Sequence, residues 1–412
     1  MNIDKSSMQV ELIQDLHQLA SISSEWDCLW ADVPSADLFL GREWFSIWWH
    51  NFSEATDSVA LHVTSGYRVI HFQPRQLRPN ILLVRAQGVC VAILPLLYFS
   101  DSWRNLPARI LLSPLNGQSW RSGVLTAESD SAAVLDTLMR YLKAQADWDV
   151  LLMDGVPVES AVIANLRSAA CAQGLWVSRA DFPWRHSYLA LNGSWDEYVQ
   201  AKGKHFRKHM RQAEGYLAQL GELSFECYRA DADREMGLQI FLEIDQSSWK
   251  AVSGESVAAI PALTGFYSDL YRQMHQQGTC EIWVLRIGQT PVSAVFCMNS
   301  RGTLYAYKTS SKEQYTSAKL SPGMILLTHL IKQGYGVGLN EVDFLSDMPI
   351  THRWTSTAHE FARTSIYAAH YYGKLLFIVD YLARWLRPLF GQIKGRVWDG
   401  LKGVNGFLTR SI

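Results

Sequence analysis

The sequence predicts an α/β protein with mixed sheets, built from a duplicated unit. Short apolar strands alternate with amphipathic helices along the chain. In each half a helix leads into an apolar strand, at residues 148–153 and again at 341–345, and each strand is followed by a proline, Pro157 or Pro349. The length of 412 residues fits two or three domains, and the hydrophobic share of 48% allows a sizeable core. Two mixed sheets packed side by side are the simpler alternative to a duplication.

Hydrophobic spacing and breaker residues predict the elements in order. In the first half, aromatic residues at helical spacing predict helices between residues 26 and 52 that belong to the core. The elements expected next are strands over 59–63, 81–85 and 89–98, a helix from 131 to 146, the strand over 148–153 and a helix over 158–173. The second half is expected to hold a long basic helix over 195–220, a strand over 223–228, helices over 233–249 and 261–277, strands over 280–286, 292–298 and 303–309, a helix over 321–332 and the strand over 341–345.

Composition excludes several classes of protein. With 38 Lys and Arg against 39 Asp and Glu, the chain is not a general polyanion binder. Six scattered cysteines and twelve histidines show no metal-ligand spacing, so we expect no metal and no disulfide framework. The longest uncharged apolar stretch, residues 88–100, is too short to span a bilayer, and the first residues do not resemble a secretion signal. A cytoplasmic protein is expected.

The segment over residues 373–412 differs from the rest because it is basic and amphipathic. It holds seven Lys and Arg against Asp380 and Asp399. The apolar face predicted for a helix here comprises Leu375, Ile378, Val379, Leu382, Trp385, Leu386 and Leu389. The opposite face holds Asp380, Arg384, Arg387 and Lys394. Such a helix suits an anionic membrane surface, and packing on the body of the protein or on a partner is the alternative.

A candidate anion site lies at the start of the helix predicted from residue 321. Ser321 suits the N-cap, Pro322 suits the first turn, and Gly323 lets another group approach the backbone before Met324. The N–H groups and the helix dipole then favour a bound phosphate. An ordinary capped helix is the alternative.

A run of basic residues precedes this site by more than a hundred positions. Lys204, Arg207, Lys208 and Arg211 share one face of the predicted helix, with no acid among them for pairing. The stripe suits the phosphates of a cofactor, a nucleotide-linked sugar or tRNA, or it is a solvated face.

Candidate catalytic groups lie on the strands beside the anion site. Asp343 is a candidate base and Tyr307 a candidate acid for acyl transfer. Lys308 or Arg353 is a candidate partner that would instead make Asp343 structural. Arg353 also suits a phosphate or carboxylate, and Trp354 suits stacking on a sugar or adenine.

Several short motifs together resemble the CelD/BcsL group of GNAT-superfamily acetyltransferases. They are the tryptophan-rich opening, the segment Ser194, Trp195, Tyr198, Arg207, Lys208, Arg211, the strand with Tyr305 and Tyr307 followed by a Pro-Gly helix start, and the segment from Asp343 to Trp354. The group is found beside cellulose and exopolysaccharide synthesis genes and is similar to the FemA/FemX transferases, which carry two GNAT units in tandem. The resemblance implies GNAT-like units over residues 1–190 and 191–372, followed by the extension over 373–412.

The resemblance also implies an activity. We expect an acyltransferase that uses acetyl-CoA or another acyl-CoA, with Ser321, Pro322, Gly323, Met324, Lys204, Arg207 and Arg211 at the cofactor. Lys308, Arg353 and Trp354 are expected at the substrate, a hydroxyl or amine of a saccharide or lipid-linked sugar in exopolysaccharide or cell-envelope biosynthesis. The alternatives are a FemX-like aminoacyl transferase that uses charged tRNA, and a catalytically silent scaffold of a polysaccharide synthase complex.

Overall fold

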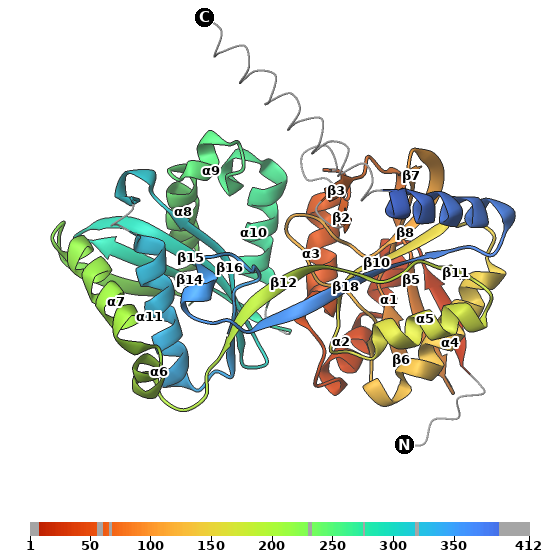
Figure 1. Cartoon of the computed structure of the whole chain (residues 1–412), viewed down its shortest axis with the longest axis horizontal. Helices are drawn as coiled ribbons and strands as arrows, with labels where there is room; N and C mark the ends of the chain where they lie inside the picture. The colour runs from red at the N-terminus through yellow and green to blue at the C-terminus, as the bar shows by residue number, and fades with distance from the viewer. Residues whose placement is uncertain are drawn as a thin grey trace, which may run out of the picture.

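The computed structural model describes residues 8–55, 61–65, 68–229, 233–274, 277–317 and 321–386. Its mixed α/β class confirms the prediction. Figure 1 shows two lobes side by side, with two long strands running between them, β12 (Asp181–Ala190) and β18 (Ala358–Tyr367). The first lobe comprises the described part of residues 8–190 together with 358–386, and the second lobe comprises the described part of 191–357.

The first lobe combines mostly antiparallel strands with helices on both sides. Its helices are α1 (Leu16–Ser21), α2 (Ser23–Asp32), α3 (Arg42–Phe52), α4 (Ser131–Ala144) and α5 (Val162–Ala172). Its strands before β12 are β1 (Gln9–Ile13), β2 (His62–Ser65), β3 (Arg68–His71), β4 (Arg75–Pro79), β5 (Ile81–Ala86), β6 (Val89–Leu94), β7 (Leu97–Trp103), β8 (Leu106–Leu112), β9 (Leu125–Thr126), β10 (Val150–Pro157) and β11 (Trp176–Val177). Residues 371–386 are helical and follow β18.

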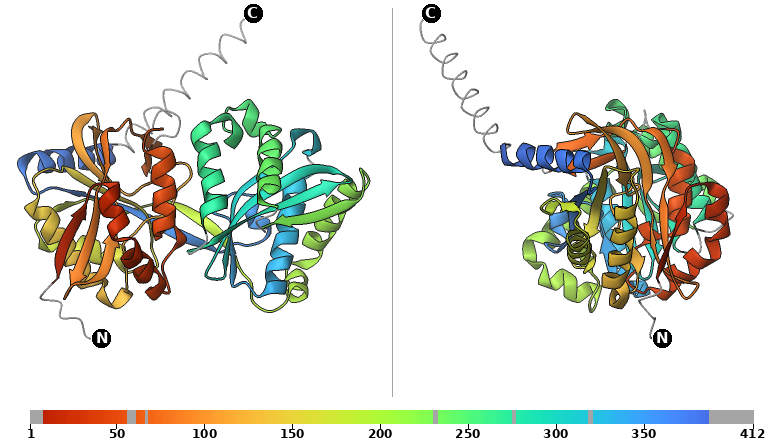
Figure 2. Two further views of the ribbon diagram at one scale, coloured as in Figure 1. Left: turned by 180° about the vertical axis from the view of Figure 1, so that it is seen from behind. Right: turned by 90° about the vertical axis from the view of Figure 1, so that its right-hand side faces the viewer.

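The second lobe is a sheet with helices on its two faces (Figure 2). Its helices are α6 (Trp195–Ala201), α7 (Gly203–Ala218), α8 (Arg234–Gln246), α9 (Trp249–Val252), α10 (Pro261–Gln273) and α11 (Pro322–Val337). Its strands are β13 (Leu223–Tyr228), β14 (Thr279–Ile287), β15 (Thr290–Ser300), β16 (Thr303–Ser311) and β17 (Glu341–Asp343). Alternate residues of β14 and β15 face α8 and α10 on one side and α7 and α11 on the other.

One sheet passes through both lobes. Within the described residues its order is β13-β14-β15-β16-β17-β12-β18-β10-β8-β7-β4, and β11 pairs with β18. A second sheet has the order β1-β5-β6-β9. Because β18 lies between β12 and β10, a strand from late in the sequence completes the sheet of the first lobe.

The two halves repeat one crossover. β7 and β8 form a hairpin, α4 follows, and β10 returns parallel to β8. β15 and β16 likewise form a hairpin, α11 follows, and β17 returns parallel to β16. Parallel neighbours need such a crossover because a tight turn cannot join them. The repeat agrees with the predicted duplication, although the sheets are continuous rather than separate.

The lobes share an aromatic core. Trp26, Trp44 and Trp48 are completely buried, as predicted for this segment. Trp44 on α3 meets Phe266 on α10 at a ring-centroid distance of 5.4 Å. Because α3 and α10 belong to different lobes, burial of these large rings holds the lobes together.

Three predicted elements need comment. The basic helix expected over 195–220 is split into α6 and α7 at Gly203, whose φ of 81° lies in the left-handed region that favours glycine. The strand expected over 59–63 falls partly outside the described residues, and so does the extension after residue 386. Among the described helices, none has the length and apolar character needed to cross a bilayer.

Candidate active site

The short strand β17 pairs with β16 only along the beginning of β16. Their parallel register joins Thr303–Tyr305 to Glu341–Asp343, after which β17 ends and β16 continues to Ser311. The backbone N–H of Lys312 donates to Val292 O on β15. In an antiparallel pair the backbone groups of successive residues point alternately toward and away from the neighbouring strand, so those of Thr309 point away from β15. The last part of β16 therefore presents an edge that β17 does not cover.

The start of α11 lies against this end of β16. Pro322 occupies the first turn, and the side chain of Ser321 makes no capping hydrogen bond. A Cβ atom added at Gly323 would lie 3.1 Å from Ser311 Oγ and 3.3 Å from Thr309 Cγ2, so glycine allows the close approach. The positive end of the helix dipole thus lies beside the uncovered part of β16, which is where an anion would be stabilised.

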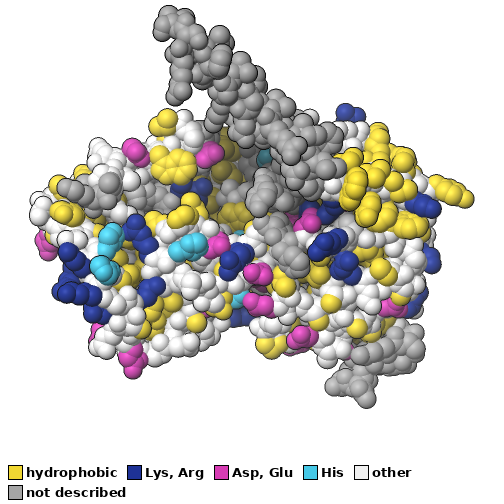
Figure 3. All heavy atoms as spheres, in the orientation of Figure 1, with side chains coloured by type: hydrophobic (Ala, Val, Ile, Leu, Met, Phe, Trp, Pro, Cys, Tyr) yellow, Lys and Arg dark blue, Asp and Glu magenta, His cyan; other side chains and the backbone are white. Residues whose placement is uncertain are grey.

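Arg353 connects the start of α11 with the basic helix α7. Its exposed guanidinium donates from Nη1 to the sulfur of Met324 at 2.8 Å and lies 3.5 Å from Nε2 of His209. The structure therefore brings three of the predicted elements together: the helix start, Arg353 and α7. Figure 3 shows Lys and Arg side chains gathered over α7 at the edge of the second lobe.

The three basic residues of α7 that were predicted to contact the cofactor differ in their own contacts. Arg207 donates from Nη1 to the carbonyls of Val199 and Gln200 at 3.2 and 3.1 Å, and Arg211 donates from Nε to Arg207 O at 3.3 Å. Lys204 is exposed. Arg207 and Arg211 line a groove of about 440 Å³ between α7 and α11.

The same groove has an apolar floor and a cationic rim. Phe206, Met210 and Ile325 contribute to the floor, and Lys332 joins Arg207 and Arg211 at the rim. His329, which also lines it, stacks on Phe225 with ring centroids 3.9 Å apart, and burial lowers its pKa. An apolar floor with a positive rim suits a ligand that carries both a ring system and phosphates.

Asp343 is completely buried at the end of β17. Its carboxylate pairs with Arg121 and accepts the backbone N–H of Leu345 at 2.8 Å. Burial raises the pKa of Asp343, and Arg121 and the N–H oppose that shift. Arg121 also pairs with Asp37 at 3.0 Å. Burial by itself would lower the pKa of Arg121, but the two carboxylates raise it, so the guanidinium stays charged.

Tyr307 does not lie opposite Asp343, because the register pairs Asp343 with Tyr305. The hydroxyl of Tyr307 donates to Gln118 O at 2.6 Å, and burial raises its pKa well above the usual value. Neither Tyr307 nor Asp343 lines the groove between α7 and α11 or either of the two cavities described below.

The structure places Trp354 in the core between α11 and β17. It is 1% exposed, stacks on Phe344 at 5.5 Å and donates from Nε1 to Thr328 Oγ1 at 3.2 Å. Lys308 is half-buried on β16, and burial lowers its pKa while Asp245 and Glu255 oppose the shift.

Sequence reasoning missed Lys250. Its ammonium donates to Thr309 O at 2.6 Å, on the uncovered edge of β16, and to Ser310 Oγ at 2.9 Å. It lies 3.6 Å from Asp245, which accepts from Ser310 Oγ at 2.6 Å. Burial, with a smaller effect of Lys308, lowers the pKa of Lys250 to about 8. The signal in the sequence is that Lys250 is the only Lys or Arg between Arg234 and Arg272.

A second missed feature is a cavity of about 470 Å³ beyond the end of β17. Trp120, Trp184, Arg185, His186, Leu345, Ser346 and Asp347 line it. The buried indole N–H of Trp184 has no partner among the described residues. Leu345 has a φ of 50°, a strained value for a branched residue that is held here by the N–H bond to Asp343. Two tryptophans beside charged groups suit a polar ligand with apolar faces.

A further cavity, of about 290 Å³, opens on the first lobe and has Asp37, Arg121, Ser122 and Thr126 in its wall. Arg121 thus lies between the two cavities, since it also contacts His186 at 3.3 Å. Burial lowers the pKa of His186 well below its usual value, and Arg121 and His359 add to the shift.

One group among the described residues is close enough to hold a metal ion, Glu341, Asp343 and His359. His359 Nε2 lies 3.2 Å from Glu341, and Asp343 pairs with Arg121. These pairs account for all three side chains without an ion.

The second lobe contains the segment for which a family comparison gives a match. Residues 204–349 match the family model described as an acetyltransferase (GNAT) domain. The second lobe therefore carries a GNAT domain, and the protein is an enzyme of the acyltransferase class.

Several solved structures resemble most of the chain, at low sequence identity. FemX is 15% identical, and the alignment covers 85% of this chain and 96% of FemX with a TM-score of 0.52. A conserved protein of unknown function from Bacteroides thetaiotaomicron is 13% identical over 87% of this chain and 100% of that one, with a TM-score of 0.45. A tandem GNAT protein from the clavulanic acid biosynthesis pathway is 11% identical over 86% and 98%, with a TM-score of 0.39. No curated protein sequence matches this chain. At such identities the FemX likeness concerns the fold.

Proposed function

We propose that the protein transfers an acetyl or related acyl group from acyl-CoA to a hydroxyl or amine of a saccharide or lipid-linked sugar. The observation that carries the proposal is the start of α11. Its first turn has no side-chain cap and lies against the uncovered edge of β16, beside Arg353, inside the segment that matches the GNAT domain.

The donor is proposed to bind along α11. Ser321, Pro322, Gly323 and Met324 hold the pyrophosphate at the helix start, and Arg353 faces the same phosphates. The groove between α7 and α11, with Arg207 and Arg211 at its rim, takes the nucleotide end, and exposed Lys204 adds positive charge. Acyl-CoA supplies the activated thioester. The backbone N–H groups on the uncovered edge at the end of β16 then orient it and polarise its carbonyl, since Thr309 O already accepts from Lys250.

The acceptor is proposed to bind in the cavity beyond β17. Trp120 and Trp184 offer flat apolar faces, while Arg185, Asp347 and the unpaired indole N–H of Trp184 offer polar contacts. This combination suits a sugar ring, whose faces are apolar and whose edges carry hydroxyls. Lys308 stays a proposed substrate contact from β16. Trp354 lies in the core, so we propose that it acts indirectly, by supporting the residues that form the walls of the site.

Two groups are proposed for the base. Asp343 lies beside the acceptor cavity, but its carboxylate already pairs with Arg121 and accepts the backbone N–H of Leu345. Lys250 lies at the edge of β16 that faces the donor, and its pKa of about 8 lets its neutral amine take a proton near neutral pH. We favour Lys250 as the base and Asp343 as a positioning residue. Tyr307 stays the proposed acid for the leaving thiolate.

A second candidate function is aminoacyl transfer from charged tRNA. The alignment with FemX over most of both chains supports it as a fold-level argument, and exposed α7 offers the positive surface that an RNA phosphate needs. A silent scaffold of a polysaccharide synthase complex is the third. Calorimetry separates them, since acetyl-CoA binding supports the first, tRNA binding the second, and binding of neither the third.

The biological setting is part of the proposal. We infer membership of the CelD/BcsL group, a role in exopolysaccharide or cellulose biosynthesis, and a cytoplasmic location at the inner face of a membrane. The units over 1–190, 191–372 and 373–412 are also a proposal. The sheet supports a boundary near residue 190, and the pairing of β18 with β10 favours counting β18 with the first unit.

The deciding test is calorimetry with acetyl-CoA. Gly323→Glu puts a carboxylate at the helix start and is expected to weaken binding by about tenfold or more. Gly336→Glu is the matched control, because it lies on the same helix with open space around its Cβ position. Gly323→Ala, which crowds Ser311 Oγ and Thr309 Cγ2 but adds no charge, separates sterics from charge. Equal binding by Gly323→Glu and the parent, with equal melting temperatures, would overturn the donor site.

A further inference from the structure

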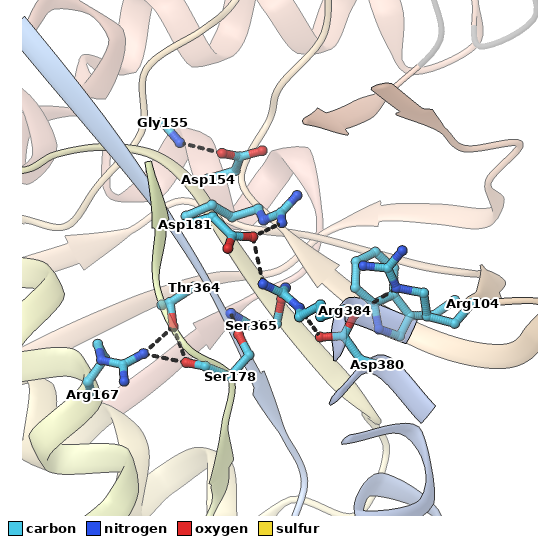
Figure 4. A network of polar contacts seen from close by, with 12 residues as sticks. Arg104, Asp154, Gly155, Arg167, Ser178, Asp181, Thr364, Ser365, Asp380 and Arg384 are labelled. Carbon is cyan, nitrogen blue, oxygen red and sulfur yellow. Dashed lines mark hydrogen bonds and ion pairs between the residues drawn. The ribbon is translucent and has the colours of Figure 1, made fainter. Parts of the chain in front are cut away.

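The helix over residues 371–386 turns its charged side to the protein. Asp380 is 1% exposed and accepts from Arg104 Nε and Arg384 Nε, each at 2.7 Å. Arg384 Nη1 also donates to Asp181 at 2.6 Å (Figure 4). Arg363 pairs with the same carboxylate. Asp181 and Arg363 belong to β12 and β18, so the network fixes the helix to the strands that run between the lobes.

Apolar contacts reinforce this orientation. Leu376 is completely buried, and Phe377 stacks on Trp176 with centroids 5.6 Å apart. Lys374 reaches over the same Trp176 ring, at 5.1 Å from its centroid. The side predicted from sequence to be polar is therefore the side that packs.

The opposite side of the helix is an apolar stripe that the described residues leave uncovered. It consists of Leu375, Ile378, Leu382 and Trp385, which are 41–62% exposed, flanked by Tyr371 and Tyr381. These six make up more than a third of the large hydrophobic residues exposed on the described chain, gathered on one face of a single helix. Figure 3 shows the corresponding hydrophobic patch at the end of the first lobe. So dense a patch marks an interaction surface.

The composition of the stripe and of the sequence after it indicates what it binds. Tyrosine and tryptophan beside leucine and isoleucine suit the boundary between headgroups and acyl chains. Residues 387–412, outside the described part, hold Arg387, Lys394, Arg396, Lys402 and Arg410 against Asp399 alone. A second copy docked on the stripe would bring two such basic segments together, which is repulsive. An anionic lipid surface neutralises them instead.

We propose that this stripe lies in the interface of an anionic lipid bilayer, and that the ion-pair network behind it holds the helix in the orientation that membrane contact requires. The inference rests on the membrane location proposed above, and its test needs no acyl-transfer assay. Contact through a fixed helix would hold the first lobe against the bilayer in one defined orientation.

The experiment is co-sedimentation of the full chain with vesicles of phosphatidylcholine, with and without phosphatidylglycerol. The parent is expected to sediment with the anionic vesicles and to be released as salt rises. The stripe variant Ile378→Asp, Leu382→Asp, Trp385→Asp is expected to bind at least about tenfold more weakly. The reason is that the binding free energy lost with the apolar burial exceeds about 1.4 kcal/mol, which corresponds to a tenfold change in affinity. The matched control Leu220→Asp, Met236→Asp, Val337→Asp adds equal charge at exposed apolar positions elsewhere and is expected to bind like the parent.

A charge variant tests the basic segment in the full chain. Replacing Arg387, Lys394, Arg396, Lys402 and Arg410 by Gln is expected to weaken binding to anionic vesicles and to abolish its salt dependence. The proposal is overturned if the parent does not bind anionic vesicles, or if the stripe variant binds them as tightly as the parent does. It is also overturned if the stripe variant melts much earlier than the parent, which would mean that the stripe is covered within the chain. Light scattering that shows a dimer only for the parent would assign the stripe to a second copy.

Discussion

The guanidinium of Arg121, in the loop between β8 and β9, pairs with the carboxylate of Asp343 at the end of β17, and both groups are buried. More than two hundred residues separate them in sequence. The pair connects the first lobe to the strand of the GNAT domain that ends beside the proposed donor edge and the proposed acceptor cavity.

Removing Arg121 is expected to destabilise the protein strongly. Arg121→Met leaves Asp343 buried without its cation, which typically costs about 3–5 kcal/mol. Urea unfolding measures the loss. Arg140→Met, which breaks an exposed pair with Asp136 on α4, is the control and should cost less than about 1 kcal/mol. The double variant Arg121→Met, Asp343→Asn is expected to recover part of the loss, and no recovery would mean that the pair does not act as a unit.

Lys250 is expected to set the pH dependence of turnover. If the neutral amine is the base, as proposed, kcat/KM should fall as the pH drops below about 8. Lys250→Met and Lys250→Arg should each lower kcat by about 100-fold, since neither side chain takes up a proton here. Release of free CoA thiol, followed at several pH values, measures this. Lys143→Met, exposed on α4, is the control.

Asp343→Asn distinguishes the two proposed bases. A positioning role predicts a lower melting temperature and a pH profile that keeps its apparent pKa near 8. Loss of turnover by about tenfold or more with unchanged stability, and a parent profile that is flat above neutral pH, would instead make Asp343 the base.

The buried ring of His186 is expected to make the protein sensitive to acid. Its folded pKa lies well below the usual 6.5, so below that pH the unfolded chain binds a proton that the folded protein does not, and stability falls as pH falls. His359, whose pKa is raised by Glu341 against the effect of burial, contributes the opposite slope. His186→Gln should therefore lose about 1 kcal/mol less stability than the parent between pH 7 and about pH 5. Identical slopes in urea titrations would contradict this.

The two tryptophans of the acceptor cavity are expected to govern acceptor binding. Trp120→Ala and Trp184→Ala should each raise KM for a saccharide acceptor by about tenfold or more while leaving acetyl-CoA affinity unchanged. Trp49→Ala, which removes a partly buried tryptophan on α3 that does not line the acceptor cavity, is the control for lost bulk. A uniform loss of donor and acceptor binding would mean that the substitutions disturb the fold rather than the cavity.

Local signals predicted most of the second lobe. The alternation over residues 223–228 predicted β13 at its observed bounds, and Ser321-Pro322-Gly323 predicted the start of α11 to within one residue. These features depend on neighbours in sequence, so they can be read from it. The break at Gly203 was missed because the basic and apolar spacing continues across it.

Long-range features could not be predicted in this way. Nothing near Asp343 in the sequence indicates Arg121 as its partner. The expected partners were Lys308 and Arg353, but Arg353 contacts the sulfur of Met324 instead. For the helix over 371–386, periodicity placed Leu375, Ile378, Leu382 and Trp385 on one face and Asp380 and Arg384 on the other, as the structure has them. It did not show which face packs, because that depends on Arg104 and Asp181, far away in sequence.

The position of β18 has a consequence for how the chain is made. β10 is complete at Pro157, but its neighbour β18 begins only at Ala358, roughly 200 residues later. At about 5–20 residues per second, a ribosome needs on the order of 10–40 s to supply it. Throughout that interval β10 has an unpaired edge, which is the kind of edge that other strands recruit. The first lobe therefore closes only after the second lobe has been synthesised, and its nascent state is the stage at which a chaperone would be needed.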